Sequence, residues 1–89
     1  MSLKIIVLGD GTDHGGKVIA GSPVHDIDGK PIARLGDLVD CPAHGENRIV
    51  SAHATLTVGG VAVAVDGCET ECGSRLIGSG TASVEAPGR

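Results

Sequence analysis

The chain contains no phenylalanine, tyrosine or tryptophan among its 89 residues. No large aromatic side chain can therefore anchor a core. An excess of positive charge is also missing: the net charge is -4, which argues against a nucleic-acid partner because such partners require a basic face. A domain this small buries a modest share of its surface, so a metal ion or an oligomeric contact is a common additional source of stability.

Long apolar runs are absent as well. No stretch approaches the roughly 20 apolar residues of a membrane-spanning helix. The apolar run 5–8 is too short for the core of a signal peptide, and no small-residue cleavage site follows it. We therefore expect the chain to start in the cytoplasm and not to use the general secretory route. Three cysteines are an odd number, which argues against a full disulfide framework, and in a reducing compartment cysteine near histidine more often binds metal.

Glycine and β-branched residues are abundant instead. Fifteen glycines predict many turns, and valine and isoleucine favour strands, whereas no window of about eleven residues has helical periodicity. The predicted strands are 4–8, 17–19, 24–27, 31–34, 48–50, 55–58, 61–65 and 75–77, with hairpin turns at 28–30 and 59–60. The sequence therefore predicts one all-β domain over residues 1–89, with a short flexible tail from about residue 82.

An internal repeat organises these strands. The segments HGGKVI (14–19), HGENRI (44–49) and CGSRLI (72–77) each place a metal-capable side chain before a glycine, spacer residues and the start of an apolar run, at intervals of 30 and 28 residues. A shift of 31 residues also superposes Gly29 on Gly60 and Cys41 on Cys72. Copies that wrap around one axis would bring the metal-capable side chains together, so the repeat predicts a pseudo-threefold object tied by a metal ion.

Four residues are the leading ligand candidates. His14, His44 and Cys72 occupy corresponding places in the repeated segments, and Cys41 precedes His44 by two intervening residues. That spacing lets one turn present both side chains to one ion, and imidazole and thiolate are the ligands that zinc prefers. We therefore predict one zinc ion bound by His14, Cys41, His44 and Cys72.

Other interpretations of these residues stay open from the sequence alone. His53 or Cys68 could replace Cys41 as the fourth ligand, while His25 is expected to be a solvated strand residue. The cysteines could instead be small buried hydrophobes, with the histidines at the surface. A disulfide between Cys72 and either Cys41 or Cys68 is a further alternative.

The candidate site could be structural or catalytic. Asp13, Asp40 and Glu71 adjoin the candidate ligands and could supply a base, but no His-Glu-x-x-His motif is present. Four ligands from the chain would leave no open position for water, which favours a closed, structural zinc. A small zinc-dependent hydrolase and a thiol-redox or metal-binding module are the competing functions.

The residues resemble a known family at this point. The segments 9–16, 29–37, 41–45 and 72–73 are similar to the PAAR-repeat proteins, whose Pro-Ala-Ala-Arg phrase here corresponds to Pro31, Ile32, Ala33 and Arg34. The resemblance covers roughly residues 5–80. The second copy departs from it, since Val61 and the residues after it contain neither the proline nor the arginine.

This resemblance implies a small cone of short β-hairpins with pseudo-threefold repeats and a structural Zn²⁺ near the apex. It implies a non-enzymatic role as the tip that caps and sharpens the trimeric valine-glycine-repeat spike of a type VI secretion system, one tip per trimer. The tip would help to puncture a target membrane, which it contacts transiently, and to deliver effector proteins. It would reside in the bacterial cytoplasm before the apparatus fires and be secreted by it.

Overall fold

Short strands and turns make up the whole of what the computed structural model describes, namely residues 2–27, 29–53, 55–78 and 83–85. The strands are β1 (Ser2–Lys4), β2 (Gly11–Thr12), β3 (Lys17–Val18), β4 (Asp26–Ile27), β5 (Lys30–Pro31), β6 (Leu38–Cys41), β7 (Gly45–Arg48), β8 (Thr57–Val58), β9 (Val61–Ala62), β10 (Leu76–Ile77) and β11 (Ser83–Glu85). The described residues contain no helix, which confirms the predicted all-β class, and hence none that could cross a membrane.

Three hairpins close into a small barrel. Five strands form one antiparallel sheet in the order β10-β2-β3-β6-β7. The bridges Ile49–Thr70 and Glu69–Arg75 close the ring, because they join β7 to residues 69–70 and those residues to the segment that leads into β10. A closed ring leaves no free edge, so each short strand is held by neighbours on both sides rather than by its own propensity.

The three hairpins are built alike, and their backbone hydrogen bonds reveal the repeat. In each copy one residue makes two backbone hydrogen bonds. Its amide donates to the carbonyl three residues earlier, and its own carbonyl accepts a bond from an amide of the returning strand. The residues at this position are Asp10, Asp37 and Cys68, and their partners on the returning strands are Val18, Ile49 and Leu76. A left-handed glycine precedes each position, with φ of 92°, 88° and 91° at Gly9, Gly36 and Gly67. The predicted pseudo-threefold repeat is therefore confirmed.

A ring of three hydrogen bonds marks the axis that relates the copies. The Ile6 amide donates to the Ala64 carbonyl (3.0 Å), the Ala64 amide to the Ala33 carbonyl (3.0 Å), and the Ala33 amide to the Ile6 carbonyl (2.9 Å). All three residues are fully buried. Because each residue donates to one copy and accepts from the other, the ring can form only where all three copies meet.

The hydrophobic core includes the three residues of this ring. Its members are small or β-branched residues together with one leucine: Ile6, Val18, Ala33, Val39, Ile49, Ala64, Val65, Cys68 and Leu76. Burying one large aliphatic side chain contributes about 1.5–3 kcal/mol. No member of this core is larger than leucine or isoleucine, in line with the absence of aromatic residues from the sequence.

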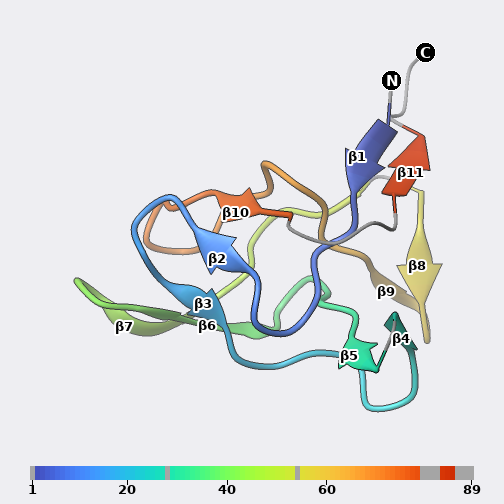
Figure 1. Cartoon of the computed structure of the whole chain (residues 1–89), viewed down its shortest axis with the longest axis horizontal. Coiled ribbons are helices and arrows are strands. Elements are labelled where there is room, and N and C mark those ends of the chain that lie inside the picture. The colour runs from blue at the N-terminus through green and yellow to red at the C-terminus, as the bar shows by residue number, and fades with distance from the viewer. Residues whose placement is uncertain (1, 28, 54, 79–82, 86–89) are drawn as a thin grey trace.

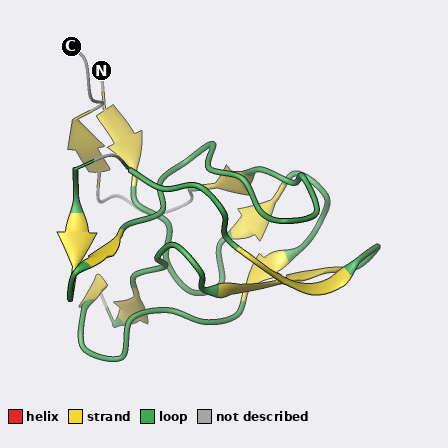
Figure 2. Cartoon of the chain, turned by 180° about the vertical axis from the view of Figure 1, so that it is seen from behind, coloured by secondary structure: helices red, strands yellow, loops and turns green. Residues whose placement is uncertain are grey.

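Three peripheral two-stranded sheets extend from the barrel: β4-β5, β8-β9 and β1-β11. The carbonyls of Pro31, Ala62 and Lys4 accept equivalent bonds from the amides of Leu8, Leu35 and Asp66, so β5, β9 and β1 correspond to one another. The third sheet is thus formed by strands from the two ends of the chain. Figures 1 and 2 place these sheets toward one end of the molecule and the tips of the barrel hairpins toward the other.

Several strand boundaries differ from those predicted. The structure has strands β2 and β6, and it starts β7 at Gly45, where the sequence predicts turns or loops. These segments are rich in glycine and polar residues, and barrel closure overrides their weak local preference. Strand β11 lies in the segment predicted as a flexible tail. Residues 82 and 86–89 of that segment, residues 79–81 before it, and Asp28 of the first predicted turn lie outside the described residues.

Candidate metal centre

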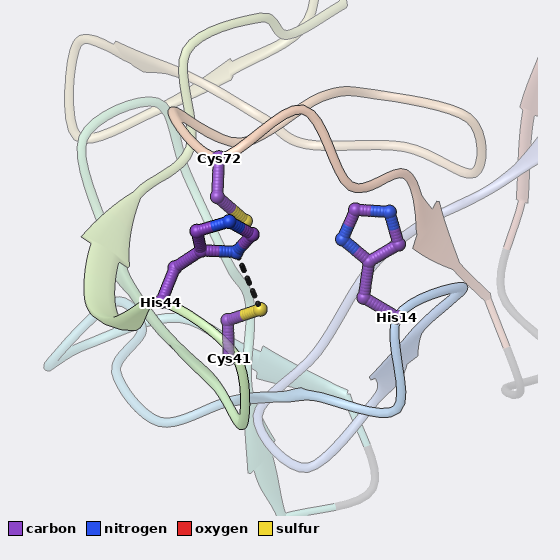
Figure 3. Close-up of side chains that lie close together, drawn as sticks. All are labelled: His14, Cys41, His44 and Cys72. Atoms are coloured by element: carbon purple, nitrogen blue, oxygen red, sulfur yellow. Dashed lines mark hydrogen bonds between the residues drawn. The ribbon is translucent and has the colours of Figure 1, made fainter.

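Four metal-capable side chains meet at the end of the barrel that carries the hairpin tips. His14 lies in the turn between β2 and β3, Cys41 ends β6, His44 lies in the turn before β7, and Cys72 lies in the turn before β10. One ligand atom from each lies within 4.8 Å of every other (Figure 3). The structure therefore brings together the four residues that the sequence singled out, from three different hairpins.

The hydrogen-bond register shows which of these residues are related by the repeat. Asp10, Asp37 and Cys68 occupy equivalent positions, and His14, Cys41 and Cys72 each follow their counterpart by four residues. Cys41 is therefore the counterpart of His14 and Cys72, as the 31-residue shift also indicated, whereas the three repeated segments placed His44 there. The three-fold repeat alone supplies three of the four side chains.

The second hairpin supplies the remaining side chain because it is longer than the others. Asp37 to Ile49 spans four more residues than Asp10 to Val18 or Cys68 to Leu76. The extra residues lengthen β6 and β7 and add a turn that carries His44. The Nδ1 atom of His44 lies 3.4 Å from the Sγ atom of Cys41. An insertion in one copy thus adds a fourth donor side chain to the three that the repeat supplies.

The first turn is shaped by Thr12 and Gly16. The buried Thr12 hydroxyl accepts hydrogen bonds from the amides of Gly16 (3.0 Å) and His14 (3.3 Å). A Cβ atom on Gly16 would lie 2.3 Å from the carbonyl oxygen of Asp40, so only glycine lets the first hairpin approach β6 this closely. This close approach sets the separation of His14 and Cys41.

The third turn surrounds Cys72 with polar groups. The Sγ atom of Cys72 lies 3.2 Å from the Thr70 hydroxyl and 3.4 Å from the Ser74 hydroxyl, and the two hydroxyls are 2.6 Å apart. The Cys72 amide donates to the side-chain oxygen of Asn47. Both hydroxyl residues are buried, so their hydrogen bonds fix the position of the sulfur.

These contacts favour the thiolate form of Cys72. Hydrogen bonds from the Ser74 side chain, the Thr70 side chain and the Ser74 backbone, with a smaller one from Cys41, lower the pKa of Cys72 from 9.0 to about 5. Burial acts in the opposite direction and is outweighed. Because the thiolate is the form that binds metal, Cys72 is prepared as a ligand at neutral pH.

The donor set fits zinc. Two thiols and two imidazoles are a common combination in structural zinc sites, and the sulfur and nitrogen donors of a tetrahedral zinc lie about 3.3–3.8 Å apart. The ligand atoms here all lie within 4.8 Å of one another, so any separation beyond that range is about 1 Å at most, which side-chain rotation can close. His14 and His44 are exposed, while Cys41 is buried and Cys72 is half-buried, so the cluster reaches the surface through its imidazoles.

The competing candidates lie elsewhere. His53 is buried, and its Nδ1 atom accepts hydrogen bonds from the amides of Thr55 (3.2 Å) and Leu56 (3.0 Å). The Ser22 hydroxyl accepts the corresponding two amide bonds in the first copy, so His53 stabilises a turn. Cys68 belongs to the hydrophobic core. His25 is exposed and directly precedes β4.

Two of the carboxylates beside the cluster hold neighbouring hairpins together. Asp13 accepts a hydrogen bond from the Arg75 amide (2.9 Å), and Glu71 accepts one from the Arg48 amide (2.8 Å). Each bond joins two copies of the repeat. These contacts are structural, which weakens the case for either carboxylate as a general base.

The sequence interpretation missed the residues that support the cluster. Thr12 and Thr70 each precede a candidate ligand by two residues, and this recurrence is a detectable signal. Asn47 and Ser74 carry no comparable signal, because their roles depend on which hairpin lies beside them.

Comparisons with known proteins give one finding. A model of the PAAR motif matches residues 8–78, which is most of the chain and includes all four clustered side chains. A search of curated proteins returns no match.

Proposed function

Because the chain belongs to the PAAR motif family, which is structural and related to the spike tips of type VI secretion systems, we propose that it caps one spike as a metal-stabilised tip. The proposed partner is a trimeric valine-glycine-repeat spike protein, with one copy of this chain per trimer. The tip would sharpen the spike, help it to puncture a target membrane and carry effector proteins outward. It would reside in the bacterial cytoplasm until the apparatus fires and would then be secreted by it.

The ring of hydrogen bonds among Ile6, Ala33 and Ala64 is the observation that carries this proposal. It gives a single chain an approximate three-fold axis, with three similar peripheral sheets arranged around it. A true trimer can meet such a surface with each subunit facing one copy of the repeat, without requiring the tip itself to be a trimer. The end that carries the peripheral sheets would face the trimer, and the end that carries the clustered side chains would lead.

A metal ion would have a clear role at the leading end. The tips of three hairpins meet there, and a pointed end has little interior in which to bury apolar side chains. We propose that one zinc ion, held by His14, Cys41, His44 and Cys72, ties these tips together. In small zinc modules the bound ion contributes on the order of 10 kcal/mol to folding.

The same geometry favours a structural ion over a catalytic one. Four protein donors satisfy a tetrahedral ion and leave no position for a reactive water. The neighbouring Asp13 and Glu71 carboxylates accept backbone hydrogen bonds from adjacent copies. A hydrolase would need both an open coordination position and an available base.

Co-purification with a valine-glycine-repeat trimer from the same cell, followed by native mass spectrometry, tests the proposal. We expect a complex of one chain and one trimer. Val24, which is 76% exposed and precedes β4 in a peripheral sheet, provides the disruptive variant Val24→Glu. Val50, which is 52% exposed and follows the barrel strand β7, provides the matched control Val50→Glu.

The expected result is weaker binding for Val24→Glu and unchanged binding for Val50→Glu. Three chains per trimer would contradict the proposal, and so would the absence of a complex with every such trimer in the cell. An equal loss of binding in the two variants would contradict the proposed orientation.

A further inference from the structure

Two of the clustered side chains are thiols from different hairpins. Cys41 ends the outgoing strand of the second hairpin, and Cys72 lies in the turn of the third. Their sulfur atoms belong to the group of ligand atoms that lie within 4.8 Å of one another. All three cysteines of the chain are free thiols. Because no chain segment lies between them, these two sulfurs can react with each other without unfolding.

The surroundings of the two sulfurs differ. Cys72 is half-buried and touches the hydroxyls of Thr70 and Ser74, so a small polar molecule can reach it and find hydrogen-bond donors beside it. Cys41 is 1% exposed and lies beside His44. Access therefore favours Cys72 as the first sulfur to meet a dissolved oxidant and Cys41 as the one that resolves the product.

Cys68 is a poor competitor. Although only three residues separate it from Cys72 in the sequence, it is buried in the hydrophobic core. It takes the place of Asp10 and Asp37 at the base of its hairpin, whereas Cys72 lies at the tip. Pairing Cys68 with either clustered thiol would require the core to open.

We propose that Cys41 and Cys72 form a redox-sensitive modification site, at which hydrogen peroxide converts the two thiols to a disulfide and releases the bound metal. The release rests on the proposed metal site, whereas the disulfide does not. Cys72 Sγ attacks one peroxide oxygen, the O–O bond breaks, and a sulfenic acid and a hydroxide form. Cys41 Sγ then attacks the Cys72 sulfur, the S–O bond breaks, and a second hydroxide leaves. The two sulfurs lose two electrons, the peroxide gains them, and solvent or thiol protons complete two molecules of water.

The product would keep part of the connection that the metal provides. A disulfide removes both sulfur donors, and two imidazoles alone hold zinc weakly. The second and third hairpins would remain joined by a covalent bond, while the first hairpin, which carries His14, would lose its connection at the tip. The end of the molecule would therefore stay tied in an oxidising environment, by two hairpins instead of three.

Treatment of the full-length, zinc-loaded protein with hydrogen peroxide tests this site. Zinc content is measured first, which tests the proposed metal site on its own. Released zinc is then followed with a chromogenic chelator, and free thiols are counted after denaturation. Digestion of the denatured product after Glu46 and Glu69 places Cys41, Cys68 and Cys72 on three separate peptides, so mass spectrometry identifies the linked pair.

We expect complete zinc release, the loss of two of the three thiols, a mass decrease of two hydrogen atoms, and a link between the peptides that carry Cys41 and Cys72. Cys68→Ala should give the same link and lose both of its thiols. A link that includes Cys68, sulfinic acid on unlinked cysteines, or a disulfide between two molecules would overturn the proposal. If the protein contains no zinc, the metal site is wrong, yet the Cys41–Cys72 link is still expected and its absence would overturn the redox site as well.

Discussion

Replacement of Gly16 by alanine should destabilise the protein and separate two of the clustered side chains. A Cβ atom at this position would lie 2.3 Å from the Asp40 carbonyl oxygen and 3.1 Å from the Thr12 hydroxyl. An ordinary contact begins at 3.4 Å, so β3 and β6 would have to move apart by about 1 Å. Because Lys17 pairs with Asp40 at this point, the movement strains the ladder that positions Cys41.

The size of the effect follows from these contacts. Inserting a methyl group where the backbone cannot easily move costs about 1–3 kcal/mol, and each weakened ladder hydrogen bond adds about 1 kcal/mol. We expect the free energy of unfolding to fall by about 2–4 kcal/mol. Zinc affinity should fall as well, because His14 and Cys41 move apart.

Urea denaturation of metal-free and zinc-loaded protein measures the stability, and chelator competition measures the affinity. The matched control is Gly11→Ala in the adjacent strand, where a Cβ atom would meet only the Gly16 carbonyl oxygen at 3.6 Å. That variant should stay within about 1 kcal/mol of the original protein. If both variants are equally stable and bind zinc equally well, the close packing of the first hairpin against β6 does not set the geometry of the site.

Three further outcomes are expected. Zinc removal by a chelator should lower the melting temperature steeply, because a core without aromatic residues cannot replace a bond of on the order of 10 kcal/mol; an unchanged melting curve after verified removal would contradict this. Arg34→Val should lower the free energy of unfolding, measured by urea denaturation, by only about 1 kcal/mol, although it removes the ion pair in which two guanidinium nitrogens contact Asp37. The reason is that the other copies carry Val7 and Val65 at this position, and a loss several times larger would show that the copies are not equivalent. In metal-free protein the ultraviolet absorbance of thiolate should report a Cys72 pKa of about 5, and an ordinary pKa would refute the role of the hydroxyls. The stability that this thiolate contributes should be complete above the unfolded-state pKa of 9.0 and be lost as the pH falls through 5.

The sequence predicts the fold class and the repeat because both depend on residues that recur at fixed spacing. Turn glycines such as Gly36 and Gly67 occupy conformations that other residues rarely adopt, so they mark the repeat directly. Strands such as β2 and β6 are not predictable in this way. Their residues have weak local preferences, and they are strands only because the barrel closes around them.

The candidate ligands are predictable for a similar reason, but their relationship is not. Counting from one glycine-containing segment to the next pairs His14 with His44, since both precede a glycine. The hydrogen-bond register pairs His14 with Cys41 instead, because the second hairpin contains an insertion, and the corresponding residues Asp10, Asp37 and Cys68 are therefore 27 and 31 residues apart. The supporting contact from Asn47 to the Cys72 amide depends on which hairpins lie side by side.

We propose that two sulfurs and two nitrogens from three hairpins enclose one zinc ion. X-ray absorption spectroscopy at the zinc edge of the purified protein tests it most directly. We expect a four-coordinate ion with two sulfur neighbours at about 2.3 Å and two nitrogen neighbours at about 2.0–2.1 Å, from Cys41, Cys72, His14 and His44. A spectrum that requires an oxygen ligand from water, more than four ligands or a single sulfur would contradict the closed structural site.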